Sequence, residues 1–160
     1  MNGRSAWRRG LKIVHELAAT GVGGGFATCL VVGWIADPSA PAAFAASREA
    51  IAAVCKWVLV PSLAAVLVSG LLAIAATRGY HSAGWAWVKA LLGLSLFEAT
   101  LVTVAASGRQ AELAAAAASD PSLVAALLRS ERTTLWLLLG LSVANVVLAV
   151  WRPKLVYTVR

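Results

Sequence analysis

Long runs of apolar residues, separated by shorter polar segments, dominate the sequence. Four of these runs are essentially uncharged, and each is close to the ~20 residues that a helix needs to cross about 30 Å of hydrocarbon. Because a backbone in lipid must satisfy its own hydrogen bonds, runs of this length favour helices over strands. With their flanks included, the sequence predicts four transmembrane helices, at residues 11–35, 50–77, 82–107 and 133–151.

Together these helices predict one domain over residues 1–160, an all-α polytopic bundle of four transmembrane helices. The longest connection, 108–132, is rich in alanine and contains Ser119-Asp120-Pro121, a typical helix start. We expect it to form one or two short external helices that return the chain from the third transmembrane helix to the fourth. The alternative is a dedicated site for a partner protein.

Composition agrees with a membrane protein. Hydrophobic residues make up 60% of the chain, charged residues only 13%, and the mean hydropathy is +0.79; soluble domains carry about 25% charged residues. The net charge of +7 does not indicate a nucleic-acid partner, because the Lys and Arg residues flank the apolar runs and do not gather on one aqueous face. The lipid bilayer is the expected partner.

The distribution of basic residues predicts the orientation. Of the Lys and Arg residues outside the apolar runs, eight lie on the side of the termini and four on the other side. The positive-inside rule therefore places both termini and the connection at Arg78 in the cytoplasm. Because the first apolar run is too long for a typical signal peptide and contains His15 and Glu16, we expect an uncleaved first helix.

Ionisable residues inside the predicted helices are candidates for function, because they are costly at membrane depth. From the helical rise, Glu16 and Lys89 lie about 8 and 10 Å from the cytoplasmic end, so they can form an ion pair. Lys56 lies about 9 Å from the outer side and Glu98 at a comparable depth, which predicts a second pair. For Lys56 and Glu98 a structural role, holding helices in register, is the favoured interpretation.

The first helix carries His15, Gly25 and Cys29 on one face at helical spacing. The small residues beyond His15 leave space for a flat macrocycle, in which case His15 is the metal ligand and donates an imidazole nitrogen to iron. The alternative, which composition favours, is close helix packing through Gly21-x-x-x-Gly25.

Five residues complete the candidates. His81 lies in the predicted cytoplasmic connection and is the reserve axial ligand. Cys29 and Cys55 have no neighbouring Cys-x-x-Cys or histidine cluster, so we expect them to be small apolar packing groups. Pro61 predicts a kink in the second helix. Asn145, in the middle of the fourth helix, predicts an interhelical hydrogen bond with a packing role.

These unusual residues follow one another in a characteristic order along the four helices: Lys12-x-x-His15, Pro61 and Gly70, Gly84-Trp85-x-x-x-Lys89, and Trp151-Arg-Pro-Lys154. The order resembles the superfamily of small four-helix bacterial membrane proteins that includes the HemJ-type protoporphyrinogen oxidases, the copper-resistance D-type proteins and related membrane proteins. The resemblance covers nearly the whole chain and implies the inner membrane of a bacterium as its location.

The HemJ-type branch implies a b-type haem or related tetrapyrrole that serves electron transfer or porphyrinogen oxidation. The important histidine and lysine of that branch correspond here to His15 and Lys89. In this interpretation His15 is an axial ligand, Lys89 and Lys12 neutralise propionates, and Glu16 orients His15 or pairs with Lys89.

Two other functions stay open at this stage. The chain can be a non-catalytic accessory subunit of a larger membrane complex, or a homo-oligomer, that associates through its small-residue helix faces. Copper handling is the third alternative, although Met1 is the only methionine.

Overall fold

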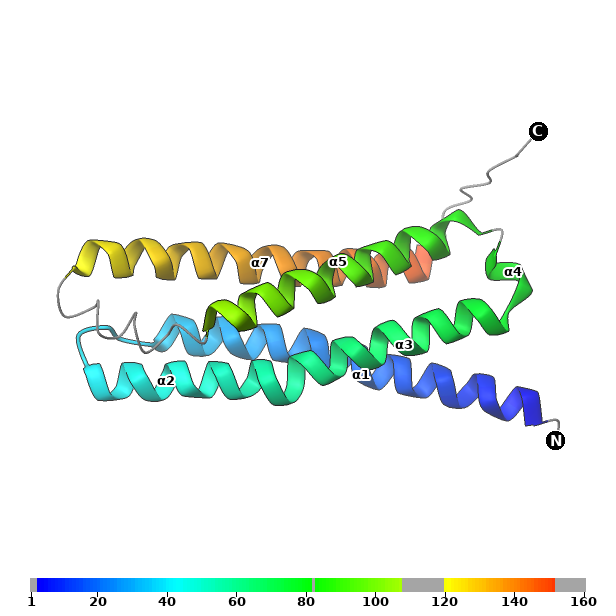
Figure 1. Ribbon diagram of the computed structural model, residues 1–160, viewed down its shortest axis with the longest axis horizontal. Coiled ribbons are helices and arrows are strands. Elements are labelled where there is room, and N and C mark those ends of the chain that lie inside the picture. The colour runs from blue at the N-terminus through cyan, green and yellow to red at the C-terminus, as the bar shows by residue number, and fades with distance from the viewer. Residues whose placement is uncertain (1–2, 82, 108–119, 152–160) are drawn as a thin grey trace.

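The computed structural model describes residues 3–81, 83–107 and 120–151, and within these ranges the regular structure is entirely helical (Figure 1). The elements are α1 (Gly3–Ile35), α2 (Pro41–Val54), the π-helix η1 (Cys55–Leu59), α3 (Val60–Ala76), the single-turn α4 (Arg78–His81), α5 (Gly84–Ser107) and α7 (Pro121–Trp151).

Four helical segments are long and apolar enough to cross a membrane, which confirms the predicted all-α fold with four transmembrane helices. α2, η1 and α3 form one continuous segment, so the spanning segments are Ala6–Ile35, Pro41–Ala76, Gly84–Val102 and Ser122–Trp151. We call the end of the bundle where α1 begins, α4 lies and α7 ends the terminal end, and the opposite end the far end (Figure 1).

Two helices are longer at the far end than predicted. The second begins at Pro41 instead of residue 50, and the fourth begins at Pro121 instead of residue 133. Proline suits the first turn of a helix because its missing N–H has no intrahelical partner there. Asp120 stabilises the start of α7 by accepting hydrogen bonds from Ser122 and Leu123. Residues 121–132 are therefore continuous with the fourth transmembrane helix and are not a separate external helix, whereas residues 108–119 lie outside the described residues.

The irregularity expected at Pro61 takes the form of the π-helix η1. Proline has no N–H to donate to the carbonyl of Trp57, four residues earlier. The preceding turn is widened, and the N–H of Val60 donates to the carbonyl of Cys55, five residues away. Such π-helical turns absorb a local mismatch in the hydrogen-bond ladder. Because Cys55 and Lys56 lie in η1, this widened turn sets the directions of their side chains.

The described core is a narrow seam between the helices. α1 packs against α3 and α7, and α5 packs against the same two helices. The buried side chains of this seam are mostly aliphatic, with Phe26 and Leu59 among the largest that are fully buried. Many large apolar side chains, Trp57 and Val150 among them, are instead exposed on the outside of the bundle. Such a surface suits lipid as its solvent.

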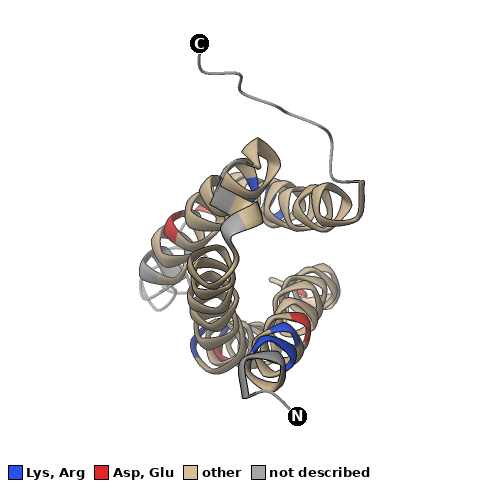
Figure 2. Cartoon of the chain, turned by 90° about the vertical axis from the view of Figure 1, so that its right-hand side faces the viewer, with Lys and Arg blue, Asp and Glu red and all other residues tan. Residues whose placement is uncertain are grey.

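The helices do not close the bundle equally at both ends. Seen from the terminal end, they form an arc that is open between α1 and α7 (Figure 2). Toward the far end these two helices meet, and the guanidinium carbon of Arg132 on α7 lies 5.9 Å from the ring centroid of Trp34 on α1. In the terminal half of the bundle, His15 contacts Ser69 and Lys89.

Candidate functional site

A polar cluster around His15 lies between α1, α3 and α5. The Nδ1 atom of His15 is 3.0 Å from the hydroxyl oxygen of Ser69, which is only 3% exposed. The Ser69 hydroxyl donates its hydrogen to the carbonyl of Ala65 at 2.5 Å. Because a hydroxyl has a single hydrogen, Ser69 accepts from His15, so the proton of the neutral imidazole lies on Nδ1. The lone pair of His15 is therefore on Nε2.

Lys89 of α5 faces that lone pair. Its Nζ atom lies 3.4 Å from the Nε2 atom of His15, at the long end of the hydrogen-bond range. Asn145 of α7 is buried, and its side-chain amide donates to the backbone carbonyl of Lys89 at 3.4 Å. The Oδ1 atom of Asn145 has no hydrogen-bond partner among the described residues. The cluster thus connects all four transmembrane segments.

Gly21 and Gly25 of α1 do not leave the space that a macrocycle needs. A Cβ atom at Gly21 would collide with the hydroxyl of Ser62, and one at Gly25 would lie 2.6 Å from the Cδ2 atom of Leu59. These positions are already filled by side chains of the second transmembrane segment, so the expected open space beyond His15 is absent there. The glycines instead allow α1 to approach that segment closely.

Other candidates of the first helix lie at the edge of this cluster. Lys12 is one turn before His15, and the side chains of Lys12 and Glu16 are both exposed. Glu16 is a direct neighbour of His15 in the chain, but the contact shown for Lys89 is with the imidazole. His81 ends α4, and its side chain lies outside the described part of the structure, as do residues 152–154 of the motif that follows α7.

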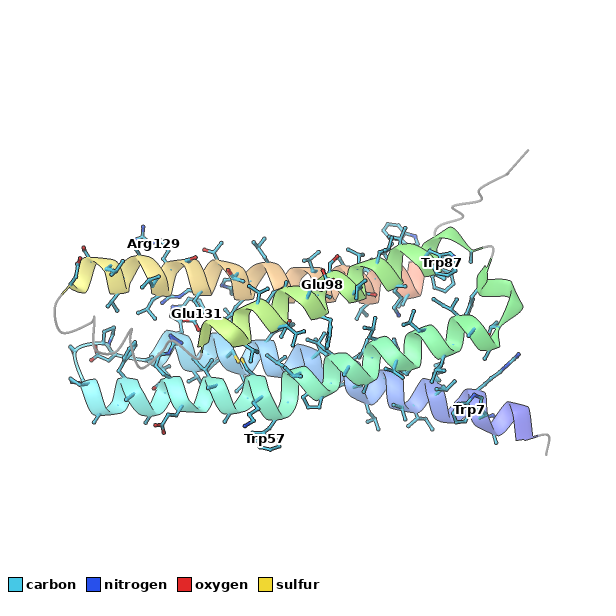
Figure 3. All side chains as sticks on the ribbon, in the orientation of Figure 1. Trp7, Trp57, Trp87, Glu98, Arg129 and Glu131 are labelled. Atoms are coloured by element: carbon cyan, nitrogen blue, oxygen red, sulfur yellow. The ribbon has the colours of Figure 1, made fainter. Side chains whose placement is uncertain are left out.

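The predicted pair of Lys56 and Glu98 does not form within the described part of the chain. The Nζ atom of Lys56 lies 5.2 Å from the ring centroid of Trp57, and the Trp57 side chain points away from the bundle (Figure 3). Glu98 is exposed on α5 and makes no hydrogen bond or ion pair with another described residue. Both charged groups therefore face the surroundings of the bundle.

Sequence reasoning missed a buried ion pair in the far half. Arg48 of α2 is 6% exposed and binds Glu131 of α7 through two hydrogen bonds, Nη1 to Oε2 at 2.6 Å and Nη2 to Oε1 at 2.9 Å. Both residues were assigned to connections outside the spanning helices. The signals that locate them were the helix starts at Pro41 and Pro121, which place each residue about two to three turns inside a helix.

The far half also brings the two cysteines together. Cys29 of α1 and Cys55 of η1 are both buried, and their Sγ atoms are 4.0 Å apart. Among the described residues, no three His, Cys, Asp or Glu side chains gather closely enough to hold a metal ion.

Comparison with family models, curated proteins and solved structures found no match for this chain. The four-helix membrane fold, the polar cluster around His15 and the buried ion pair of Arg48 and Glu131 are therefore the observations on which a function is proposed.

Proposed function

We propose that this protein is an inner-membrane redox protein that binds a b-type haem or related tetrapyrrole at His15, for electron transfer or porphyrinogen oxidation. The observation that carries the proposal is the hydrogen bond between His15 and the buried Ser69. Histidines that ligate metals commonly donate their other ring N–H to a fixed acceptor, which sets the tautomer and the ring orientation. Ser69 does this for His15 and leaves Nε2 available as a donor to iron.

The charges around His15 fit the carboxylates of such a group. Lys89 lies inside the arc beside the imidazole, and Lys12 is exposed one turn nearer the terminal end. An ammonium group binds a carboxylate strongly where water is scarce. Because the Nζ atom of Lys89 now lies against Nε2, ligand binding requires Lys89 to turn away, and a propionate supplies a better partner for it than an imidazole.

The α3 side of His15 has no room for a haem. The face toward α3 is closed, since Gly70 lies there, and a Cβ atom on Gly70 would be 3.5 Å from the Cε1 atom of His15. A bound haem supplies the one-electron couple that either reaction needs, and the chain's own residues hold it, orient it and neutralise its carboxylates.

The proposal includes an orientation and a location. The excess of basic residues on the side of the termini supports cytoplasmic ends, which places His15 in the cytoplasmic half of the bilayer. The resemblance of the chain to small bacterial membrane proteins supports the bacterial inner membrane.

The test is an absorption spectrum of the protein in mild detergent, oxidised and then reduced with dithionite, together with a haem extraction. We expect a stoichiometric b-type spectrum that is lost in His15→Ala, and a haem that is held less tightly in Lys89→Met. His81→Ala is the matched comparison, because its spectrum reports whether the second histidine is an axial ligand. A folded protein without colour, or a spectrum that His15→Ala leaves unchanged, contradicts the proposal.

A second candidate function is supported by Glu98. A carboxylate exposed on the outer face of a spanning helix is costly in lipid, and its cost falls when a neighbouring helix supplies a cation or a hydrogen-bond donor. Exposed Lys56 is such a cation on the surface of the same chain. An accessory subunit, or a homo-oligomer in which Glu98 meets Lys56 of another copy, accounts for both exposed charges.

Extraction in mild detergent separates this candidate from the first. An accessory subunit or oligomer is expected to leave the membrane with fixed partners, and Glu98→Gln is expected to release them. Glu49→Gln is the matched control, because Glu49 is also an exposed carboxylate, but on α2. A monomer in both the wild type and Glu98→Gln excludes the second candidate and leaves the haem test unaffected.

A further inference from the structure

Cys29 and Cys55 form a buried pair of thiols between α1 and η1. They are 26 residues apart in the chain, yet their Sγ atoms are 4.0 Å apart. Cys29 is 0% exposed and Cys55 is 3% exposed, and both are free thiols. A disulfide brings the sulfur atoms to about 2.0 Å, so the pair needs only a small change in side-chain rotamers if the two backbones are close enough.

The residues one turn away on each side keep the two backbones close. A Cβ atom on Gly25 would lie 2.6 Å from a methyl carbon of Leu59, and one on Gly33 would lie 3.9 Å from a methyl carbon of Ile51. Gly25 and Gly33 lie four residues before and after Cys29, and Leu59 and Ile51 lie four residues after and before Cys55. The two contacts therefore flank the cysteine pair, one on each side. Helix axes usually lie about 8–10 Å apart, and glycine permits a closer approach. The cysteines therefore sit at the centre of a tight seam.

A small pocket reaches Cys29 from the side of α7. It is lined by Cys29, the ion pair of Arg48 and Glu131, and apolar residues that include Leu135. Arg48 is 6% exposed, and its Nε atom is buried without a hydrogen-bond partner among the described residues. A buried donor without a partner favours a polar molecule with an acceptor oxygen. The burial of both thiols restricts that molecule to a small one.

We propose that Cys29 and Cys55 are a redox modification site that forms a reversible disulfide on reaction with a small hydroperoxide. The sulfur of Cys29 attacks the terminal peroxide oxygen, the O–O bond breaks, and the thiol proton leaves with the other oxygen, as water in the case of hydrogen peroxide and as an alcohol in the case of an organic hydroperoxide. The sulfur of Cys55 then displaces the hydroxyl group of the resulting sulfenic acid, which leaves as water. Two thiols thus lose two electrons and two protons, and one peroxide gains them.

The test uses the full chain in lipid nanodiscs, treated with hydrogen peroxide, quenched with acid, denatured, and labelled with N-ethylmaleimide. Intact mass spectrometry is expected to show a loss of two hydrogens and no label, and two labels after treatment with a reductant. In Cys55→Ser, oxidation is expected to stop at a sulfenic acid on Cys29 that dimedone traps. Two thiols that remain open to labelling, or oxygen added to one cysteine without loss of two hydrogens, overturn the proposal.

Two comparisons test the geometry that the proposal uses. Gly25→Ala is expected to slow disulfide formation, because the new methyl group meets Leu59 and pushes α1 and η1 apart. Gly24→Ala is expected to react like the wild type, because no atom lies within 4 Å of its new methyl group. Cumene hydroperoxide is expected to react more slowly than hydrogen peroxide, because it is too large for the pocket. Equal rates in either comparison contradict the corresponding step, and the wild-type mass measurement decides the proposal whether or not Gly25→Ala folds.

Discussion

Arg48 on α2 and Glu131 on α7 hold the far half of the bundle together through a two-pronged ion pair, with N–O distances of 2.6 and 2.9 Å. The guanidinium also lies 5.6 Å from the ring centroid of Phe44, and the ion pair borders the pocket that reaches Cys29. A charge pair at this depth fixes the position of α7 against α2, although its two residues are 83 positions apart in the chain.

Removal of one member of this pair is expected to destabilise the protein. Glu131→Gln or Arg48→Met leaves the other charge buried without its counterion, which costs about 3–5 kcal/mol in comparable sites. The measurement is thermal unfolding in detergent, followed by circular dichroism. Arg129→Met is the control, because Arg129 is on the same helix but points away from the bundle (Figure 3). The double variant Arg48→Met with Glu131→Leu is expected to recover much of the stability, and a double variant as unstable as the single ones would contradict this account.

The tautomer of His15 is expected to depend on Ser69. With the wild-type side chain, the proton of the neutral imidazole lies on Nδ1, since the Ser69 hydroxyl donates to Ala65 and accepts from His15. Ser69→Ala removes this acceptor, so the Nε2–H form should gain population. Nitrogen-15 NMR shifts of the imidazole distinguish the two forms. Ser142→Ala is the control, because the hydroxyl of Ser142 donates to Leu138 on its own helix. A wild-type imidazole protonated on Nε2 would show that the Ser69 contact does not set the tautomer.

Two adjacent glycines of α1 are expected to respond in opposite ways to alanine. In Gly25→Ala the new methyl group meets Leu59, and overpacking of this kind costs about 1–3 kcal/mol. In Gly24→Ala nothing lies within 4 Å, so the higher helix propensity of alanine should stabilise the protein by up to about 1 kcal/mol. Unfolding of the two variants under the same detergent conditions measures the difference. Equal stabilities would mean that α1 and the second segment are not in close contact at Gly25.

The pH dependence of the start of α7 is set by Asp120, which lies outside the spanning segment. The Ser122 hydroxyl, together with the Leu123 N–H, holds the pKa of the Asp120 carboxyl below its ordinary value. A lowered pKa means that the carboxylate stabilises the folded state above the unfolded pKa, and that this contribution is lost as the pH falls through the folded pKa. Carbon-13 NMR titration should show the Asp120 pKa rising in Ser122→Ala, while Asp37, which is held by Ser39, keeps its own.

The extent of the helices shows where local signals sufficed. The four apolar runs predicted four spanning helices because length and hydrophobicity along one segment decide whether it can cross a bilayer. The sequence predicts a helix start at Pro121, but as that of a separate external helix, and it does not predict the start at Pro41, so both spanning helices are predicted too short. A helix that extends beyond the hydrocarbon continues for as long as its backbone and caps allow.

The candidate site shows where local signals ended. His15 and Lys89 were candidates because ionisable groups in apolar runs are conspicuous, and the structure brings them within 3.4 Å of each other. Ser69, the hydrogen-bond partner of His15, was not conspicuous, since a serine in a spanning helix is ordinary until a histidine from another helix meets it. The ion pairs show the same limit. Lys56 and Glu98 were predicted to pair and do not, whereas Arg48 and Glu131 were not predicted to pair and do. Similar depth predicted the first pair, but depth alone does not specify the face of the helix.

By itself, the sequence therefore determined that this chain is a bundle of four membrane-spanning helices, and which residues are chemically unusual within it. Tertiary structure decided which of those residues meet: His15 with Ser69 and Lys89, and Cys29 with Cys55. The physical reason is that hydrophobicity and helix capping act over a few neighbouring residues, whereas a contact between helices depends on their rotation, register and separation. Those three quantities are set by the packing of all four helices together, and even one glycine, such as Gly25 against Leu59, affects how closely two helices approach.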